Sequence, residues 1–418
     1  MRDEVAIPEQ QAHRAAETAA RNSRARLVAY LAARSGNVAA AEDALSEAFA
    51  AALETWPLQG CPQNPDAWLL TVARRKLIDA VRRQQDEDGP DELDHVAAYL
   101  NEAATGDLPD RRLGLLFACS HPAIDAGIRA PLMLQVVLGL EAARIASAFL
   151  MSPAAMSQRL VRAKTKIRQA GIPFHVPERE SLAERLEAVL DSIYAAFSEG
   201  WQDPSGADVA RRDLAEEAIY LCRIVAELLP DEPEAFGLLA LMLYAEARRM
   251  ARRNQAGEFI PLREQDTSLW DAEMIGQAEA ALLRASRTGR IGRYQLEAAI
   301  QSAHVERRRT GSTNWPAILA LYNALFAFTA SPVVELNRAL ASAEVDGPEA
   351  ALAILDGLAD DARLLDYQPY WAARADLLSR SGQVAEADQA YQRAVGPERD
   401  TAVRQFLEHC RTQLTANP

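Results

Sequence analysis

The side chains best suited to nucleic-acid chemistry in this sequence lie between residues 144 and 170. Arginine and lysine pair with phosphates and with guanine, and glutamine pairs with adenine edges. No aspartate or glutamate occurs from Arg144 to Ala170. The polar and basic side chains expected on one helix face are Ser157, Gln158, Arg159, Arg162, Lys164 and Lys166. This composition predicts a DNA-contacting surface.

The element that carries these side chains is predicted to be the second helix of a helix-turn-helix. Ser152 is a good N-cap and Pro153 suits the first helical position. The opposite face repeats apolar residues at helical spacing: Met156, Leu160, Ala163 and Ile167. A short helix with Ile145 and Ala146 precedes the break, as in modules that insert a helix into the major groove. A basic helix alone could also be a solvated face or a protein contact.

A second cluster of this kind follows the loop expected over residues 57–65, which is rich in proline and polar groups. Residues 66–83 are predicted to form one helix with apolar positions at Trp68, Val72, Ile78 and Val81. Its basic side chains are Arg74, Arg75, Lys76, Arg82 and Arg83. Aromatic and basic side chains on such a helix can hold single-stranded DNA by stacking and phosphate contact. The alternative is that Trp68 belongs to the core.

Two helices are predicted before this loop. The first spans about residues 11–34 and buries Leu27, Tyr30 and Leu31, with Gly36 at its end. The second spans about residues 38–55, and its apolar positions are Leu45, Phe49, Ala52 and Trp56. Acidic residues should make its other face negative: Glu42, Asp43, Glu47 and Glu54.

Composition predicts an all-α protein in which positive charge is local. The 418 residues are 49% hydrophobic and only 6% aromatic, with long Ala/Leu/Arg/Glu-rich runs. The net charge is −14, yet residues 110–172 carry +6. Residues 86–109 hold eight acids and no lysine or arginine, which indicates a flexible acidic linker. The net charge therefore argues against a general polyanion binder, whereas the local positive charge is compatible with one DNA-binding module.

No residue pattern indicates catalysis, a metal site or a cofactor. The four cysteines are far apart and form no C-x-x-C pair, which fits a reducing cytosol. His121 is expected to be a helix-end residue. No glycine-rich phosphate loop stands out, and no apolar run is long enough to span a membrane. We expect a cytoplasmic protein that is not an enzyme.

The C-terminal half predicts helix pairs with a period near 34 residues, which is typical of TPR-like repeats. The last pair is the clearest, with Trp371, Ala375, Gly382, Ala387, Tyr391 and Ala394 at the expected positions, and Pro397 close after. Two earlier repeats show the same kind of spacing. The residues of one are Ala218, Pro230, Phe236 and Ala240, and those of the other are Ala320, Pro332 and Gly347. Residues 250–270 interrupt this rhythm and should form an ordered loop, either functional or a plug of the repeat groove.

Together these motifs resemble an extracytoplasmic-function sigma factor of RNA polymerase. Residues 38–83 are similar to its promoter-melting region 2, in the segments 41–49, 64–69 and 73–79. Residues 110–170 resemble its region 4, and the segment 112–122 followed by a long extension is similar to a subgroup with a C-terminal TPR-like domain. The resemblance covers nearly the whole chain.

The resemblance implies a role for each matching residue. Asp43 and Glu47 would dock on the clamp coiled coil of core RNA polymerase, whose flap would be a second contact. The loop from Pro57 to Asn64 would capture a flipped base of the −10 element. Melted DNA would be held by Asn64, Trp68, Arg74, Arg75, Arg82 and Arg83. The helix from Ser152 to Ala170 would read the −35 element through the basic face described above.

The expected domains are region 2 (11–85), the acidic linker (86–109), region 4 (110–172) and a TPR-like regulatory domain (181–418). The partners of the whole protein would be core polymerase, promoter DNA and a protein or peptide that binds the repeats. Two alternatives stay open. One is a one-component helix-turn-helix regulator with a sensing repeat domain, and the other is a repeat scaffold whose basic helix contacts protein.

Overall fold

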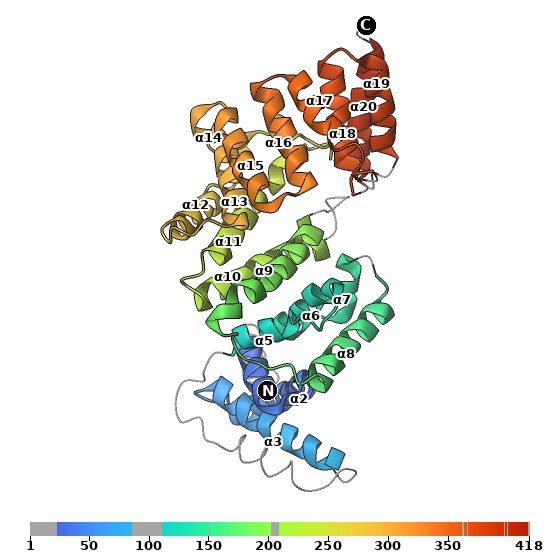
Figure 1. Ribbon diagram of the computed structural model, residues 1–418. Helices are drawn as coiled ribbons and strands as arrows, with labels where there is room; N and C mark the ends of the chain where they lie inside the picture. Colours follow the sequence, from blue (N-terminus) through green and yellow to red (C-terminus); the bar gives the residue numbers. More distant parts are fainter. Residues whose placement is uncertain are drawn as a thin grey trace. The chain divides into compact units, whose positions relative to one another are not determined.

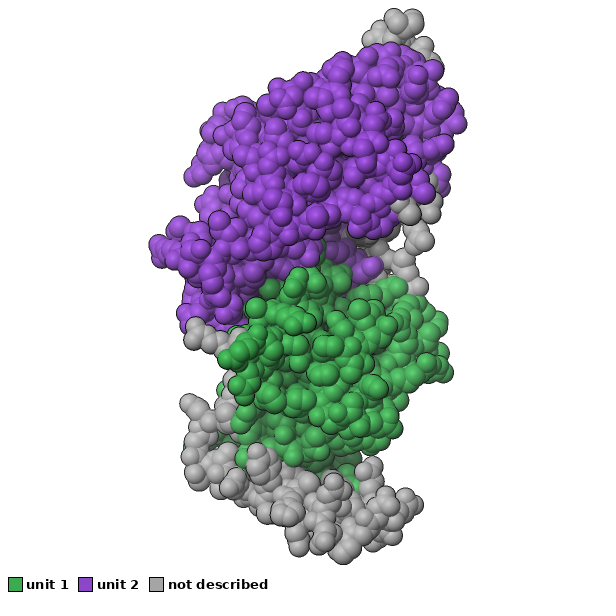
Figure 2. Space-filling view, in the orientation of Figure 1, with its two compact units in different colours: residues 1–196 green, residues 197–418 purple. Residues whose placement is uncertain are grey.

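The computed structural model describes residues 23–85, 111–149, 151–201, 209–361, 363–365, 367–396, 398 and 400–416. Within these ranges every regular element is a helix, apart from an isolated β-bridge between Arg253 and Phe259. The predicted all-helical class is therefore confirmed. The chain divides into two compact units, residues 1–196 and residues 197–418 (Figure 2).

Unit 1 begins with a helix over residues 23–35, and its other helices follow in chain order (Figure 1). They are α2 (Val38–Gln59), α3 (Pro65–Gln85), α5 (Arg112–Cys119), α6 (Ala126–Leu138), α7 (Ala142–Ala148) and α8 (Pro153–Gln169). Helix α9 (Arg179–Trp201) crosses the boundary between the units. The predicted helical residues 11–22 and the acidic linker 86–109 lie outside the described residues.

The turn between the first two helices follows the sequence expectation. Leu27, Tyr30 and Leu31 are buried, and Gly36 ends the helix with a φ of 65°. A positive φ is accessible to glycine without the steric cost that a Cβ imposes. Asn37 then starts α2, because its Oδ1 accepts a hydrogen bond from Ala40 N at 3.2 Å.

The end of α2 differs from the prediction that residues 57–65 form a loop. The helix continues through Pro57 to Gln59, and Gly60 N closes it by donating to Trp56 O at 2.9 Å. Proline lacks an N–H, so the carbonyl of Leu53 loses its helical donor. Leu53 itself is an exposed residue at 41%. Only residues 60–64 connect α2 to α3.

The buried residues of α2 and α3 differ from the core positions predicted for α2 and from the apolar positions noted for α3. In α3 the buried residues are Leu69, Leu70, Ala73 and Leu77, whereas Trp68, Val72 and Ile78 are only half-buried. The side chain of Val81 lies outside the described residues. The i, i+4, i+8 series of Leu69, Ala73 and Leu77 follows the helical repeat more closely. In α2, Ala48 is buried instead of Phe49, and Glu42 is buried rather than on the acidic face.

Unit 2 is a succession of helices, most of which pack on their neighbours in the chain (Figure 1). They are α10 (Val209–Leu228), α11 (Pro233–Glu246), α12 (Ala272–Ser286), α13 (Arg293–Val305), α14 (Arg307–Thr310), α15 (Trp315–Thr329), α16 (Pro332–Val345), α17 (Pro348–Asp356), α18 (Gln368–Arg380), α19 (Val384–Val395) and α20 (Thr401–Ala416). Helix α11 packs on α12 and α13, α15 on α16, α18 on α19, and α19 on α20. Packing between sequence neighbours is what an array of helix pairs requires.

The last helix pair has its small residues where the repeat pattern predicts them. Ala375, Ala387 and Ala394 are fully buried between α18 and its neighbours, and Gly382 makes the turn with a φ of 76°. Ala218 and Ala240 are buried in the same way. Ala320 is exposed, so the interhelical role expected for it is wrong. Pro397 lies outside the described residues.

The segment between α11 and α12 is ordered, as predicted. It contains three single turns of 3-10 helix: η1 (Arg249–Arg252), η2 (Leu262–Glu264) and η3 (Thr267–Leu269). Its backbone is closed on itself, because Ile260 N donates to Arg252 O at 2.8 Å and Asn254 N donates to Glu258 O at 3.1 Å. We call residues 253–265 the strap.

Candidate nucleic-acid and polymerase interface

Helices α7 and α8 form the helix-turn-helix that the sequence predicts. Ser152 Oγ accepts a hydrogen bond from Ala155 N at 3.3 Å, and Pro153 is the first helical residue. The buried residues of α8 are Met156, Leu160, Ala163 and Ile167, so the predicted apolar stripe is confirmed. Ile145 and Ala146 of the preceding helix are buried as well. Both helices therefore pack through the apolar face and leave the basic face outward.

The side chains on this outward face are not equally available. Ser157, Gln158, Arg162 and Lys166 are exposed. Arg162 Nη2 lies 3.4 Å from Gln158 Oε1, one helical turn away on the same face. Arginine and glutamine are the side chains that pair with guanine and adenine in the major groove. These residues are thus exposed on one face of α8, and their role in reading a −35 element stays a prediction.

Arg159 is held by Asp125, the N-cap residue of α6. Its Nη2 lies 3.2 Å from Asp125 Oδ1, and its Nη1 lies 3.4 Å from Met151 Sδ. Asp125 also accepts a hydrogen bond from Gly127 N at 3.1 Å, which fixes the carboxylate. The guanidinium is thereby restrained at the edge of α8, although both charges remain solvent-accessible. Asp125 was not among the predicted site residues, and an N-cap aspartate is its only sequence signal.

Lys164 belongs to the predicted DNA-binding face but is bound to α2 in this structure. Its Nζ lies 2.6 Å from Glu42 Oε2, and Arg24 Nη2 lies 3.5 Å from Glu42 Oε1. Glu42 is only 8% exposed, so both cations neutralise a nearly buried carboxylate. The pair joins the helices of the predicted region 2 to α8. Sequence patterns missed it because 122 residues separate its two partners.

Asn64 and Trp68 are positioned by the start of α3. Asn64 Oδ1 accepts a hydrogen bond from Ala67 N at 3.0 Å, so this residue caps the helix. The Trp68 ring is half-buried and lies edge-on to the Trp56 ring, with centroids 5.5 Å apart. Trp56 is fully buried and anchors this contact. Trp68 is therefore partly buried against Trp56 and partly exposed.

The arginines of α3 divide into two groups. Arg74 is half-buried, and its Nη2 donates to Tyr30 Oη at 2.5 Å. Arg75 is exposed, and the side chains of Arg82 and Arg83 lie outside the described residues. Next to this helix, Leu58 is 86% exposed at the end of α2. An accessible aromatic, an exposed arginine and an exposed leucine are chemically suited to unstacked bases and phosphates.

The acidic residues predicted to dock on polymerase lie on the surface of α2. Asp43 and Glu47 are exposed. Glu47 Oε2 lies 3.0 Å from Lys76 Nζ of α3, and both side chains are about half exposed. Exposed pairs of this kind contribute little stability and exchange partners readily. Both carboxylates are thus accessible to a basic partner surface.

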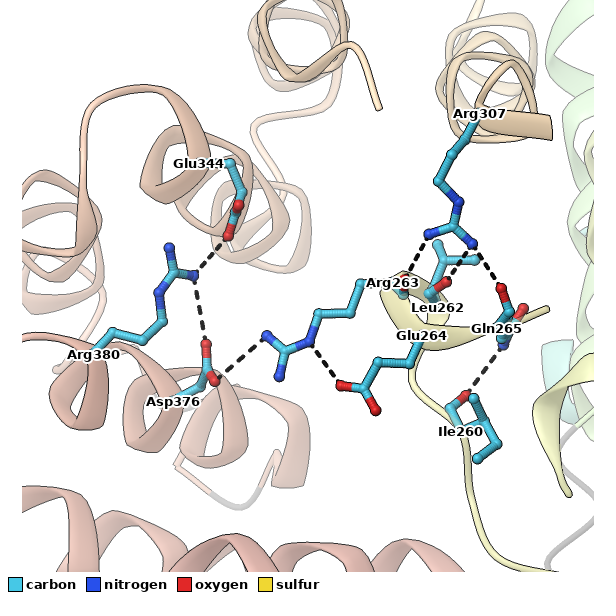
Figure 3. A network of polar contacts seen from close by, with 9 residues as sticks. All are labelled: Ile260, Leu262, Arg263, Glu264, Gln265, Arg307, Glu344, Asp376 and Arg380. Carbon is cyan, nitrogen blue, oxygen red and sulfur yellow. Dashed lines mark hydrogen bonds and ion pairs between the residues drawn. The ribbon is translucent and has the colours of Figure 1, made fainter. Parts of the chain in front are cut away.

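The strap in unit 2 is held by arginine side chains, whose polar contacts Figure 3 shows. Arg307 donates to the carbonyls of Leu262, Arg263 and Gln265 at 3.1, 2.8 and 3.1 Å. Arg263 Nη1 lies 3.9 Å from Asp376 Oδ1 of α18, which also pairs with Arg380 at 3.7 Å. These contacts hold the strap between α14 and α18, as Figure 3 shows.

The arginines just before the strap, and Arg253 at its start, have structural partners too. Arg252 Nη1 donates to Trp201 O at 2.9 Å, and Arg249 and Arg252 both stack on the Trp201 ring. Arg253 Nη2 lies 2.6 Å from Asp400 Oδ2, and the Phe259 ring packs edge-on against Phe406 of α20. Of the two readings of this loop, the contacts favour the plug.

The described residues contain no group of histidine, cysteine and acidic side chains arranged to hold a metal ion. Among them, no helix has the length and apolar character to cross a bilayer. His121 follows the end of α5, and its Nδ1 accepts a hydrogen bond from Ala123 N at 3.1 Å. The expectation of a helix-end residue is therefore confirmed.

Comparison with known proteins adds four findings. Residues 20–87 match the sigma-70 region 2 family, and residues 185–286 match a family of unknown function, DUF6596. The chain is 40% identical over 389 residues to Uncharacterized protein R00370 of Rhizobium meliloti (strain 1021), which covers 91% of this chain and 92% of that protein. No solved structure matches the chain.

Proposed function

Because the chain belongs to the family of the Rhizobium meliloti protein and carries a sigma-70 region 2 domain, we propose that it is an extracytoplasmic-function sigma factor. The match over residues 20–87 is the observation that carries this proposal, since region 2 implies a role in transcription initiation. Such a factor is not an enzyme. It binds core RNA polymerase and directs it to promoter DNA.

In this proposal the first helices of unit 1 contact polymerase and the −10 element. Asp43 and Glu47 supply exposed carboxylates for a basic surface of core polymerase. Trp68 and Arg75 hold the melted strand, with Asn64 at the adjoining helix cap and Arg74, Arg82 and Arg83 as further contacts. Extruding a base costs a few kcal/mol of unstacking, which stacking and phosphate contacts offset.

Helix α8 reads the −35 element in the same proposal. Ser157, Gln158, Arg159 and Arg162 lie at its N-terminal half, where recognition helices contact base edges. Lys164 and Lys166 contact phosphates, which position the helix without reading sequence. Lys164 cannot contact DNA and Glu42 at once. The Glu42–Lys164 pair therefore has to open when the factor engages a promoter.

Unit 2 takes the regulatory role of a separate anti-sigma protein in this proposal. From residue 173 to the end, the chain has thirty-eight acidic residues against twenty-five basic ones. Its consecutive helix pairs support a TPR-like array, and residues 253–265 are clamped within it. A protein or peptide partner of the repeats would then have to displace the strap or use another face.

Run-off transcription with core RNA polymerase and the full chain on genomic promoters tests the proposal. We expect defined transcripts that core polymerase alone does not produce. Arg162→Ala should lower promoter binding by about tenfold, since one good base contact is worth about 1–3 kcal/mol. Arg287→Ala removes an exposed arginine outside both modules and serves as the matched control. Specific duplex binding without polymerase and without transcripts would support the one-component regulator instead.

A further inference from the structure

Unit 1 contains a cavity that the DNA-binding and polymerase-binding roles do not use. It has a volume of about 570 Å³, within the range of small-molecule sites. Three chain segments form it: the end of the first helix, the residue before α5, and the chain that leaves α8. The lining residues are Tyr30, Ala33, Arg34, Ser35, Gly36, Arg111, Arg168, Gly171, Ile172, Pro173, Phe174 and His175.

The charge of this lining is one-sided. It holds three arginines and one histidine, namely Arg34, Arg111, Arg168 and His175, and none of the described lining residues is acidic. Acids outnumber bases by 59 to 45 in the chain as a whole. Guanidinium groups present planar donor pairs that match phosphate oxygens. The lining therefore selects for an anion with several phosphate-like oxygens.

The walls of the cavity are held in place by packing. A Cβ at Gly114 of α5 would lie only 2.6 Å from Phe174 O, so the chain after α8 lies close against α5. Ile172 is buried and anchors the same segment. On the other wall, the Arg34 guanidinium lies over the Tyr30 ring at 4.8 Å from its centroid. A site with a preformed wall loses less conformational entropy when a ligand binds.

We propose that this cavity binds a small molecule that carries two or more phosphoryl groups. Arg111 and Arg168 line the cavity from separate segments, so together they can neutralise two phosphoryl groups only if those groups are close together. A compact oligophosphate satisfies this condition, whereas a DNA duplex is a rod that presents its phosphates along its surface. The site goes beyond the sigma-factor function, and only its effect on promoter contact rests on that proposed function.

Because of where the cavity lies, a bound ligand would affect how the two modules of unit 1 pack together. Tyr30 to Gly36 belong to the region 2 helices, and Arg168 to His175 belong to the end of the helix-turn-helix module. A bound oligophosphate contacts both modules and stabilises the arrangement in which Glu42 pairs with Lys164. Ligand binding then disfavours the separated modules that promoter contact requires, by mass action.

Isothermal titration of the full chain with sodium tripolyphosphate at about 0.1 M salt tests this site. We expect saturable binding at one site. The double variant Arg111→Gln/Arg168→Gln should bind at least tenfold more weakly, because each lost guanidinium removes charge-assisted hydrogen bonds. Both arginines are exposed, so the fold should be unaffected. Arg287→Gln/Arg308→Gln removes the same charge from exposed positions of unit 2 and should bind like the wild type.

Ala33→Glu provides a second variant, which places a carboxylate in the lining and should also abolish binding. Absence of saturable binding at millimolar tripolyphosphate would overturn the proposal, as would equal weakening by the unit 2 control. Competition with a random-sequence DNA duplex distinguishes a small oligophosphate from the DNA backbone as the ligand of the cavity. If the duplex displaces tripolyphosphate and the double variant loses affinity for both by the same factor, the cavity is a DNA-backbone contact and the small-molecule assignment is wrong.

Discussion

The arginines of α8 and those around the strap are the same residue type in opposite settings. On α8, Arg162 is exposed, and Arg159 has a solvent-accessible aspartate as its partner. Around the strap, Arg248 is buried, and Arg252 and Arg307 donate to backbone carbonyls. A run of arginines in sequence therefore has no single meaning. The acceptors that the fold places around each guanidinium decide between a binding surface and a structural clamp.

Removal of Arg248 is expected to have the largest effect on stability. This side chain is 8% exposed, and it donates to Tyr244 O at 3.2 Å and to Gln301 Oε1 at 2.5 Å. Arg248→Ala leaves a void and unsatisfied acceptors, so we expect a loss of about 3–4 kcal/mol in the free energy of unfolding. Urea denaturation followed by circular dichroism measures it. Arg162→Ala is the exposed counterpart, and an equal loss there would contradict the comparison.

A pH dependence in unit 2 should be the next largest effect. Burial, with Arg248 and Arg307 nearby, lowers the pKa of His304 to about 4. Above about pH 6.5 the imidazole is neutral in both folded and unfolded states. Between about pH 6.5 and 4, the unfolded chain binds a proton that the folded chain does not, so stability falls as the pH falls.

The expected loss from His304 reaches about 3 kcal/mol at pH 4, at 1.36 kcal/mol per unit of pKa difference. Urea denaturation at pH 7, 6 and 5 of the wild type and of His304→Gln measures it. The variant should lose stability less steeply across this range, since glutamine does not titrate. Parallel pH profiles for the two proteins would show that His304 is not responsible.

The ion pair between the two modules of unit 1 should give the smallest of these effects. Glu42 and Lys164 are 10% and 15% exposed in their side chains, so water screens them only in part. A double-mutant cycle with Glu42→Gln and Lys164→Met should give a coupling energy of about 1–2 kcal/mol in unfolding. Hydrogen exchange of α2 and α8 reports whether the contact opens.

The same two variants also test whether Lys164 contributes to DNA binding. Glu42→Gln frees Lys164 and should raise duplex affinity at low salt, because one more cation reaches the phosphates. Lys164→Met removes that cation and should not. If both variants bind DNA like the wild type, Lys164 takes no part in DNA binding in either state.

Local signals in the sequence were sufficient to predict the two helices of the helix-turn-helix. A capping serine, a proline at the first helical position and four apolar residues at 3/4 spacing specify α8 without reference to any distant residue. The same is true of Gly382, which forms the turn between α18 and α19. Such features depend on backbone conformation and on one helix face, and a sequence displays both directly.

Only the tertiary structure decided which polar groups are neighbours. Sequence patterns placed Glu42 on an acidic surface and Lys164 on a DNA-binding face, but folding brings them within 2.6 Å. The cavity lined by Arg34, Arg111 and Arg168 likewise joins segments that lie far apart in the chain. The reason is physical: a helix face is a property of neighbouring residues, whereas an ion pair or a cavity depends on how distant helices pack.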